Sequence, residues 1–123
     1  MANEITLTAA LSVNKPSVMT NPVGRSVSGL QFGMAGLYYV DNSILVGVTA
    51  TLIPMGQVVA PHWAFFRNLD ATNFLTIRNG ASGADVVKLL PGECAFVPLL
   101  DTGTYYAIAN TAAVIMEYLV FSL

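Results

Sequence analysis

Short apolar segments separated by turn-forming residues recur along this chain at intervals of about 8–12 residues. Pro54-Met55-Gly56, the Gly/Ser/Ala-rich residues 80–85 and Pro91-Gly92 are the clearest separators. No stretch of ten residues combines a 3.6-residue apolar period with helix caps. This spacing predicts an all-β protein. We expect an antiparallel β-sandwich, jelly-roll-like, with residues 1–123 in a single domain.

The most β-favouring stretch is residues 63–79. Aromatic and branched residues stand at both of its ends, and residues 68–73 between them include Asn and Asp, which suit turns. The pattern predicts two strands joined by a tight polar turn, a central hairpin. The Pro91-Gly92 pair predicts another turn, because glycine is free to adopt a positive φ there.

Other segments are also expected to be extended. Residues 4–13 alternate apolar and polar, which is typical of a half-buried strand. Residues 14–28 contain breakers and many polar residues, and are interpreted as a long loop or an N-terminal arm that a neighbour orders. Asp41-Asn42-Ser43 predicts a turn between extended residues 29–40 and a strand at 44–53. The remaining strands are expected at residues 86–90, 94–99, 105–110 and 113–121.

The last predicted strand is apolar on both faces. Val114, Met116, Tyr118 and Val120 lie on one face, and Ile115, Leu119, Phe121 and Leu123 on the other, with Glu117 the polar exception. Such a strand is either central in a two-sided core or buried against another chain. We expect a subunit interface. Its candidate residues are Trp63, Phe65, Arg67, Arg78, Ile115, Glu117, Leu119 and Phe121.

Composition supports this expectation. Hydrophobic residues make up 54% of the chain and charged residues only 10%, where soluble domains average about 25% charged. We therefore expect a homo-oligomer whose copies cover part of each other's surface. The net charge is −2 and the five basic residues are scattered, which argues against a nucleic-acid partner. No signal peptide or long apolar run is evident, so we expect no membrane partner and synthesis in the cytoplasm.

Residues suited to catalysis are few. His62 is the only histidine, so it could be a general base but cannot complete a histidine-rich metal site. Cys94 could be a nucleophile beside His62, but its place in an alternating strand favours a small buried core residue. Glu93 with Glu117, or Asp70 with Asp85, could form an acid–base pair, although turn positions account for most of these carboxylates. We predict no catalytic, metal or cofactor residues.

Two further groups have binding alternatives. Glu117 is expected to pair with Arg67 or Arg78. Trp63, Tyr105 and Tyr106 could form a sugar-stacking platform, although aromatic residues on strands are more often core or interface anchors. Pro91-Gly92-Glu93-Cys94 before further strands resembles the barrel of the cupins, but the several histidines of a cupin metal site are missing.

A broader likeness covers most of the chain. Its elements are residues 2–7, 28–32, 63–77, Leu90-Pro91-Gly92-Glu93, 106–113 and Glu117-Tyr118-Leu119. In these the chain resembles the small β-sandwich structural proteins of tailed-bacteriophage virions. The resemblance implies a virion location after assembly in the bacterial host's cytoplasm, and partners such as the major capsid protein. It transfers no functional residue.

Three functions are therefore open at this point. The leading expectation is a non-enzymatic capsid decoration (cement) subunit, a homotrimer that stabilises the head shell. The alternative is a collar, tail or fibre component that binds a receptor or glycan. A small hydrolase using His62 with Cys94 or a carboxylate is the third, and it requires these groups within hydrogen-bond reach.

Overall fold

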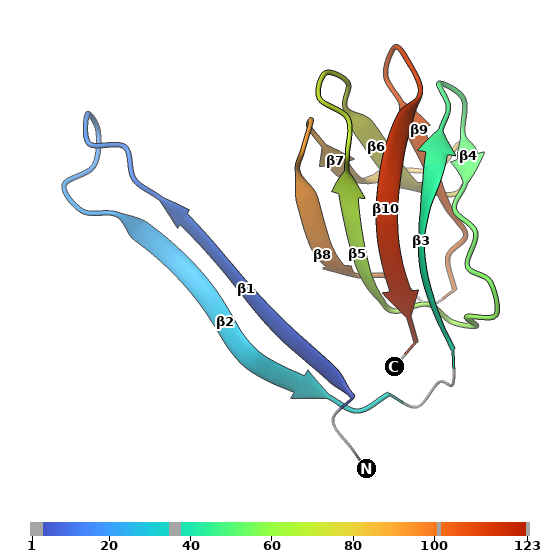
Figure 1. The fold of residues 1–123 in the computed structure, drawn as a ribbon, viewed down its shortest axis with the longest axis horizontal. Helices are drawn as coiled ribbons and strands as arrows, with labels where there is room; N and C mark the ends of the chain where they lie inside the picture. The colour runs from blue at the N-terminus through green and yellow to red at the C-terminus, as the bar shows by residue number, and fades with distance from the viewer. Residues whose placement is uncertain (1–3, 35–37, 101, 123) are drawn as a thin grey trace. The chain divides into compact units, whose positions relative to one another are not determined.

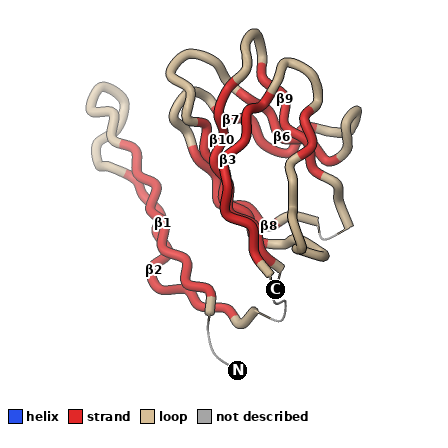
Figure 2. Tube along the Cα trace, turned by 45° about the vertical axis from the view of Figure 1, so that its right-hand side comes forward, coloured by secondary structure: helices blue, strands red, loops and turns tan. Residues whose placement is uncertain are grey.

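The computed structural model describes residues 4–34, 38–100 and 102–122, and every regular element in these ranges is a β-strand. Figure 2 accordingly shows only strands and loops. The chain divides into two compact units, Met1–Met34 and Ala35–Leu123. The first is a two-stranded hairpin and the second is a β-sandwich (Figure 1). The all-β, sandwich prediction is confirmed. No helix in the described ranges is long and apolar enough to cross a membrane.

The hairpin pairs β1 (Ile5–Val13) with β2 (Val23–Phe32) in antiparallel register. A turn at its tip is closed by Lys15, whose carbonyl accepts hydrogen bonds from the Val18 and Met19 amides at 3.0 and 2.9 Å. The strand expected at residues 4–13 is confirmed. The interpretation of residues 14–28 as one long loop or arm is wrong in its second half, because Val23 to Ser28 already belong to β2.

A β-bulge interrupts this ladder near Gly29. Leu7 pairs with Leu30 but Ala9 pairs with Val27, so Ser28 and Gly29 together oppose the single residue Thr8. Gly29 has a φ of 66°, which a side chain would strain, and its amide donates to the Thr8 hydroxyl at 3.2 Å. Beyond the bulge, the even-numbered residues Leu30 and Phe32 therefore lie on the side of the hairpin that the odd-numbered residues Val23, Arg25 and Val27 occupy before it.

The sandwich consists of two four-stranded antiparallel sheets. The nearer sheet in Figure 1 has the order β3-β10-β5-β8, and the farther sheet has the order β4-β9-β6-β7. Most consecutive strands lie in opposite sheets, which is jelly-roll-like. The bounds are β3 Tyr39–Val46, β4 Thr51–Leu52, β5 Trp63–Asn68, β6 Leu75–Asn79, β7 Asp85–Leu89, β8 Cys94–Pro98, β9 Tyr105–Ala109 and β10 Val114–Phe121.

The core lies between these two sheets. Strand β10 buries every second residue, Val114, Met116, Tyr118 and Val120, and it is central in its sheet. Phe66 from β5 and Ile77 from β6 meet it from the two sheets, and both are fully buried. The Tyr118 hydroxyl donates to the Pro54 carbonyl at 2.7 Å, and burial raises the pKa of this phenol.

The central hairpin predicted at residues 63–79 is wrong. Strands β5 and β6 lie in different sheets, and the connection between them carries the chain across the sandwich. Buried Asn68 holds this connection: its amide nitrogen donates to the carbonyls of Asn73 (2.8 Å) and Leu89 (3.2 Å), and its side-chain oxygen accepts from the Asp70 amide (2.9 Å). Crossing at this point puts the apolar residues on both sides into one shared core.

Two smaller predictions also fail. Asp41-Asn42-Ser43 is not a turn but part of β3, because these residues pair with β10 and the ladder outweighs their turn preference. The strand expected at residues 44–53 is interrupted after Val46 and resumes only as the short β4. The predicted strands at 86–90, 94–99, 105–110 and 113–121 are confirmed as β7 to β10, and Gly92 has the expected positive φ of 79°.

Candidate interaction surface

The outward side of the sheet β3-β10-β5-β8 is unusually apolar. Because successive residues of a strand point to opposite faces, the register fixes which residues share this side. We call the apolar members the apolar sheet face: Tyr39, Leu45, Trp63, Phe65, Phe96, Pro98, Ile115, Leu119 and Phe121.

Much of this face is accessible. Tyr39 and Leu45 are 68% and 65% exposed, and Ile115 and Phe96 are 50% and 48% exposed. Trp63, Phe65, Leu119 and Phe121 are half-buried. The ring centroids of Phe65 and Phe96 lie 5.1 Å apart, so these two side chains cover each other in part while the apolar sheet face stays accessible.

Five other residues share this side of the sheet. Arg67 Nη1 lies 3.8 Å from Glu117 Oε1, and both side chains are well exposed. Ser43 and Cys94 extend the same row of the sheet, and Asp41 lies beside Leu119 in the next row. The expected pairing of Glu117 with Arg67 is confirmed, and because both side chains are well exposed the pair adds little to stability.

The outward side of the second sheet has a different character. There Arg78 Nε donates to Asp85 Oδ1 at 2.8 Å, so Arg78 is not the partner of Glu117. The Lys88 ammonium lies 4.1 Å from the centroid of the Phe74 ring. Of the eight candidate interface residues, Arg78 alone is on this second sheet, and the other seven lie together on the first.

The hairpin has an apolar face of its own. Residues of β1 with odd numbers and their partners on β2 share one side, and the bulge keeps them aligned past Gly29. We call these the hairpin apolar face: Ile5, Leu7, Ala9, Leu11, Val13, Val23, Val27, Leu30 and Phe32, with Arg25 as the one charge. The opposite side carries only Thr, Ser, Gln, Ala and Gly.

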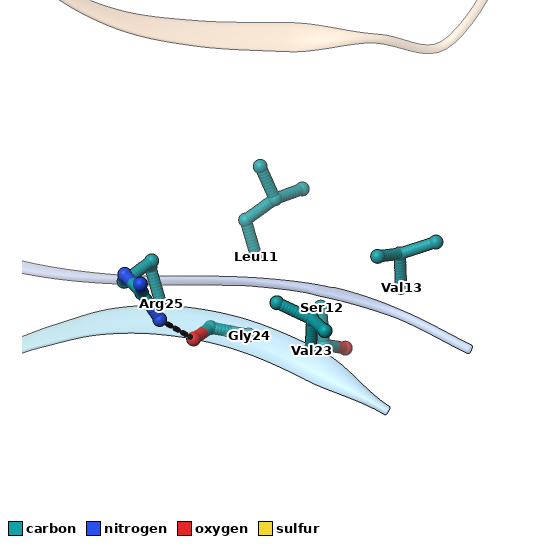
Figure 3. A pocket seen from close by; sticks show the side chains of 6 residues that line it. All are labelled: Leu11, Ser12, Val13, Val23, Gly24 and Arg25. Carbon is teal, nitrogen blue, oxygen red and sulfur yellow. Dashed lines mark hydrogen bonds between the residues drawn. The ribbon is translucent and has the colours of Figure 1, made fainter. Parts of the chain in front are cut away.

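An open depression lies on the hairpin near its tip. Figure 3 shows Leu11 and Val13 projecting from the same side of the ribbon, and Val23, Ser12, Gly24 and Arg25 complete the lining. The Arg25 guanidinium donates to the carbonyl of Gly24 at 3.0 Å. Leu11 is 79% exposed and Val13 is 54% exposed. The hairpin apolar face is therefore open to solvent here.

The residues weighed for catalysis are not brought together. Cys94 pairs with Arg67, about five residue steps along β5 from His62, which separates them by roughly 16 Å. Cys94 is exposed, so the expectation that it is a buried core residue is wrong: it falls on the outward side of an edge strand. His62 is half-buried and lies edge-on to Trp63, with 5.8 Å between ring centroids.

The carboxylates are engaged locally. Asp70 accepts from the amides of Thr72 and Asn73 at 2.9 and 2.6 Å, and these bonds, the one from Asn73 first, hold its pKa below the ordinary value. Glu93 Oε2 accepts from the Leu90 amide at 2.8 Å. Among the described residues, no group of three or more His, Cys, Asp and Glu side chains is arranged to hold a metal ion.

The alternative of a sugar-stacking platform made by three aromatic residues is not met. Trp63 is on the apolar sheet face, Tyr105 is buried in the core with its hydroxyl donating to the Leu100 carbonyl at 3.0 Å, and Tyr106 is in the other sheet. Sequence reasoning missed Tyr39, Leu45 and Phe96 as members of the apolar sheet face. Residues 39–45 carry no alternation of apolar and polar residues, and Asp41-Asn42-Ser43 favours a turn, so no local signal marked Tyr39 and Leu45. Leu123, another expected member, lies outside the described residues.

Comparisons of the chain with protein-family models, with curated proteins and with solved structures found no match.

Proposed function

We propose that this chain is a non-enzymatic structural protein of a tailed-phage virion, a self-associating subunit of the capsid decoration (cement) type that stabilises the head shell. The observation that carries the proposal is the apolar sheet face. Seven of the eight residues named from the sequence as interface candidates lie together on this side of the sheet. A contiguous apolar surface on a soluble protein is typical of a protein–protein interface.

The surface composition supports an assembly role over a catalytic one. Aromatic residues dominate the apolar sheet face, and the Arg67–Glu117 pair adds a charge pattern that can set register between copies. The sandwich supplies a rigid scaffold for such a surface, because its core is independent of the outward side chains. The virion itself, the head location and the major capsid protein as partner rest on the resemblance described above.

A trimer is the assembly we propose. Cyclic assembly covers sheet edges and apolar faces in every copy, and it presents each binding surface three times to a repeating shell. Repeated weak contacts then give a large total affinity.

The test has two parts. Light scattering of the purified protein should give a stable trimer, and the protein should co-sediment with mature, undecorated phage shells. Leu119→Asp, on the apolar sheet face, should reduce both, whereas Ile108→Asp, a half-buried outward residue of the second sheet, is the matched control. A monomer that does not bind shells would contradict the proposal.

A receptor- or glycan-binding role in a collar, tail or fibre is the second candidate. One observation favours it: Tyr39, Phe121 and Trp63 form a single cross-strand row on the apolar sheet face, and aromatic faces of this kind stack on sugars. Glycan-array binding that is lost in Trp63→Ala would favour this candidate, and no binding to any glycan would remove it.

A further inference from the structure

We infer that in the assembly the hairpin apolar face of one copy packs on the apolar sheet face of a neighbouring copy. The inference rests on the proposed function in one respect, that the protein self-associates. It adds which surface of the neighbouring copy is bound, that the contact is head-to-tail, and which residues favour this contact over others.

The hairpin needs a partner to keep its structure. Among its described residues, 4–34, none is buried, and its most covered side chains are only half-buried. A two-stranded hairpin is marginally stable in water unless its apolar side packs on something. Its two sides nonetheless differ sharply, one almost wholly apolar and one small and polar, and the Gly29 bulge preserves this division along the whole length. Such a pattern is typical of a surface that becomes buried.

The two apolar faces match in size. Strand β1 has 9 residues, so the hairpin is roughly 30 Å long and about 10 Å wide, on the order of 300 Å². The four-stranded face is about 20 Å on each side, on the order of 400 Å². Each alone falls below the ~800 Å² that one partner buries in a standard interface. One hairpin on one sheet face therefore buries roughly 300 Å² on each partner, less than a standard interface. In a ring every copy makes two such contacts, roughly 600 Å² per copy, so closure of the ring and not a single contact holds the assembly together.

The charges favour this pairing over contact between two hairpins. Arg25 is the one charge on the hairpin apolar face, and within the described residues it forms no ion pair. The apolar face of a second hairpin would bring only another Arg25, because Glu4 lies before β1 and accepts from the Met34 amide at 2.9 Å, and Lys15 lies in the tip turn. The apolar sheet face has Asp41 beside Leu119, and the described residues give Asp41 no ion pair either. Docking of the two faces lets Arg25 and Asp41 neutralise each other.

The contact joins different surfaces of two copies, so it is head-to-tail. Such contacts close into a ring when the rotation between copies allows it. A three-membered ring uses each hairpin and each apolar sheet face once and leaves none open.

Disulfide trapping tests the contact, because Cys94 is the only cysteine and lies on the same side of the sheet as the apolar sheet face. One tagged chain carries Cys94→Ala with Val13→Cys, Val27→Cys or Leu30→Cys; the other, differently tagged chain keeps Cys94 alone. After co-expression and mild oxidation, at least one of the three should form a mixed-tag disulfide dimer. Ser12→Cys and Ser26→Cys, on the polar side of the hairpin, are the matched controls and should form none.

A charge exchange gives an independent reading. Arg25→Glu and Asp41→Arg should each raise the concentration at which the oligomer dissociates by about tenfold, and the double variant should restore it. Equal losses without restoration would contradict the Arg25–Asp41 contact, and circular dichroism of each variant separates misfolding from lost assembly.

The outcomes separate the two proposals. Mixed-tag dimers from the apolar side only, with rescue by the double variant, support the inference. A stable, shell-binding oligomer that forms no such dimers would overturn the inference and leave the proposed function standing. Dimers between two hairpin cysteines would identify hairpin–hairpin contact and also overturn it. Mixed-tag dimers in a protein that binds no shell would support the contact and contradict the decoration role.

Discussion

The hairpin and the sandwich use the same kind of strand in opposite ways. In the sandwich, alternation directs one set of side chains into a shared core, and fifteen of the residues that the structure describes form a buried cluster between the sheets. In the hairpin, alternation sorts side chains just as cleanly, but the unit has no second layer and none of its described residues is buried. Alternation therefore sets which side of a strand is apolar, and a second layer decides whether that side becomes a core or a surface for a partner.

The largest difference is expected from truncation of one apolar side chain in each unit. Phe66→Ala removes a fully buried ring from the sandwich and should lower the free energy of unfolding by about 3–5 kcal/mol. Leu11→Ala removes a hairpin side chain that is 79% exposed. In dilute, dissociated protein it should change the free energy of unfolding by less than about 0.5 kcal/mol. Urea unfolding followed by the fluorescence of Trp63 reports on the sandwich, and circular dichroism in the same titration reports on all strands, the hairpin included. A large effect of Leu11→Ala at dilution would show that the hairpin has a buried contact within one copy.

The polar interior of the sandwich gives the next effect. Asn68→Ala leaves the Asn73 and Leu89 carbonyls without their donor and the Asp70 amide without its acceptor. We expect a loss of about 2–4 kcal/mol, measured by thermal unfolding. Asn110→Ala, at an exposed position between β9 and β10, is the control. A loss no larger than that of the control would mean that water replaces these hydrogen bonds.

The hairpin should respond to a backbone change more than to a side-chain change. Gly29→Ala puts a Cβ at a φ of 66°, which costs about 1 kcal/mol. Hydrogen exchange should speed up for the amides of β1 and β2 while the amides of β10 keep their protection. Ser28→Ala, the neighbouring bulge position, should leave both unchanged. Faster exchange in β10 as well would show that the two units open together.

The smallest expected effect depends on pH and belongs to the sandwich alone. Asp70 has a pKa below its ordinary value of 3.8 in the folded protein, so its bonds stabilise the fold above that pH and this contribution is lost as pH falls through the lower, folded pKa. Asp70→Asn should therefore unfold at a lower temperature than the unchanged protein at pH 7, and the two should converge only as the pH falls from 3.8 through the lower, folded pKa of Asp70. Calorimetry across this range checks the sign. A constant difference would exclude titration of Asp70 as the cause.

Local patterns predicted the later strands well. Short, almost wholly apolar runs at residues 105–109 and 114–121 and the Pro91-Gly92 turn were sufficient, because turn-forming residues bound these runs in the sequence itself. Five of the seven interface candidates that share a face are apolar residues at outward positions of β10 and β5, against the usual pattern, and Arg67 and Glu117 were named because their charges were expected to pair.

Pairing between distant segments was not predictable in this way. Trp63 to Asn79 has all the local features of a hairpin, yet Asn68 anchors a crossing between sheets through partners as distant as Leu89. The first part of β2, Val23 to Ser28, was missed because its polar side consists of glycine and serine, which also favour loops, and because the apolar phase of the strand changes at Gly29. Long-range partners and bulges determine both features, and neither leaves a local periodic signal.

The irregularity at Gly29 also restricts what shape can receive the hairpin. A bulge increases the local right-handed twist of the two strands, so the hairpin apolar face is twisted along its length. A flat or cylindrical partner surface, such as that of a single helix, would contact the hairpin apolar face only in patches. Another β-sheet, coiled in the same sense, can follow it from end to end.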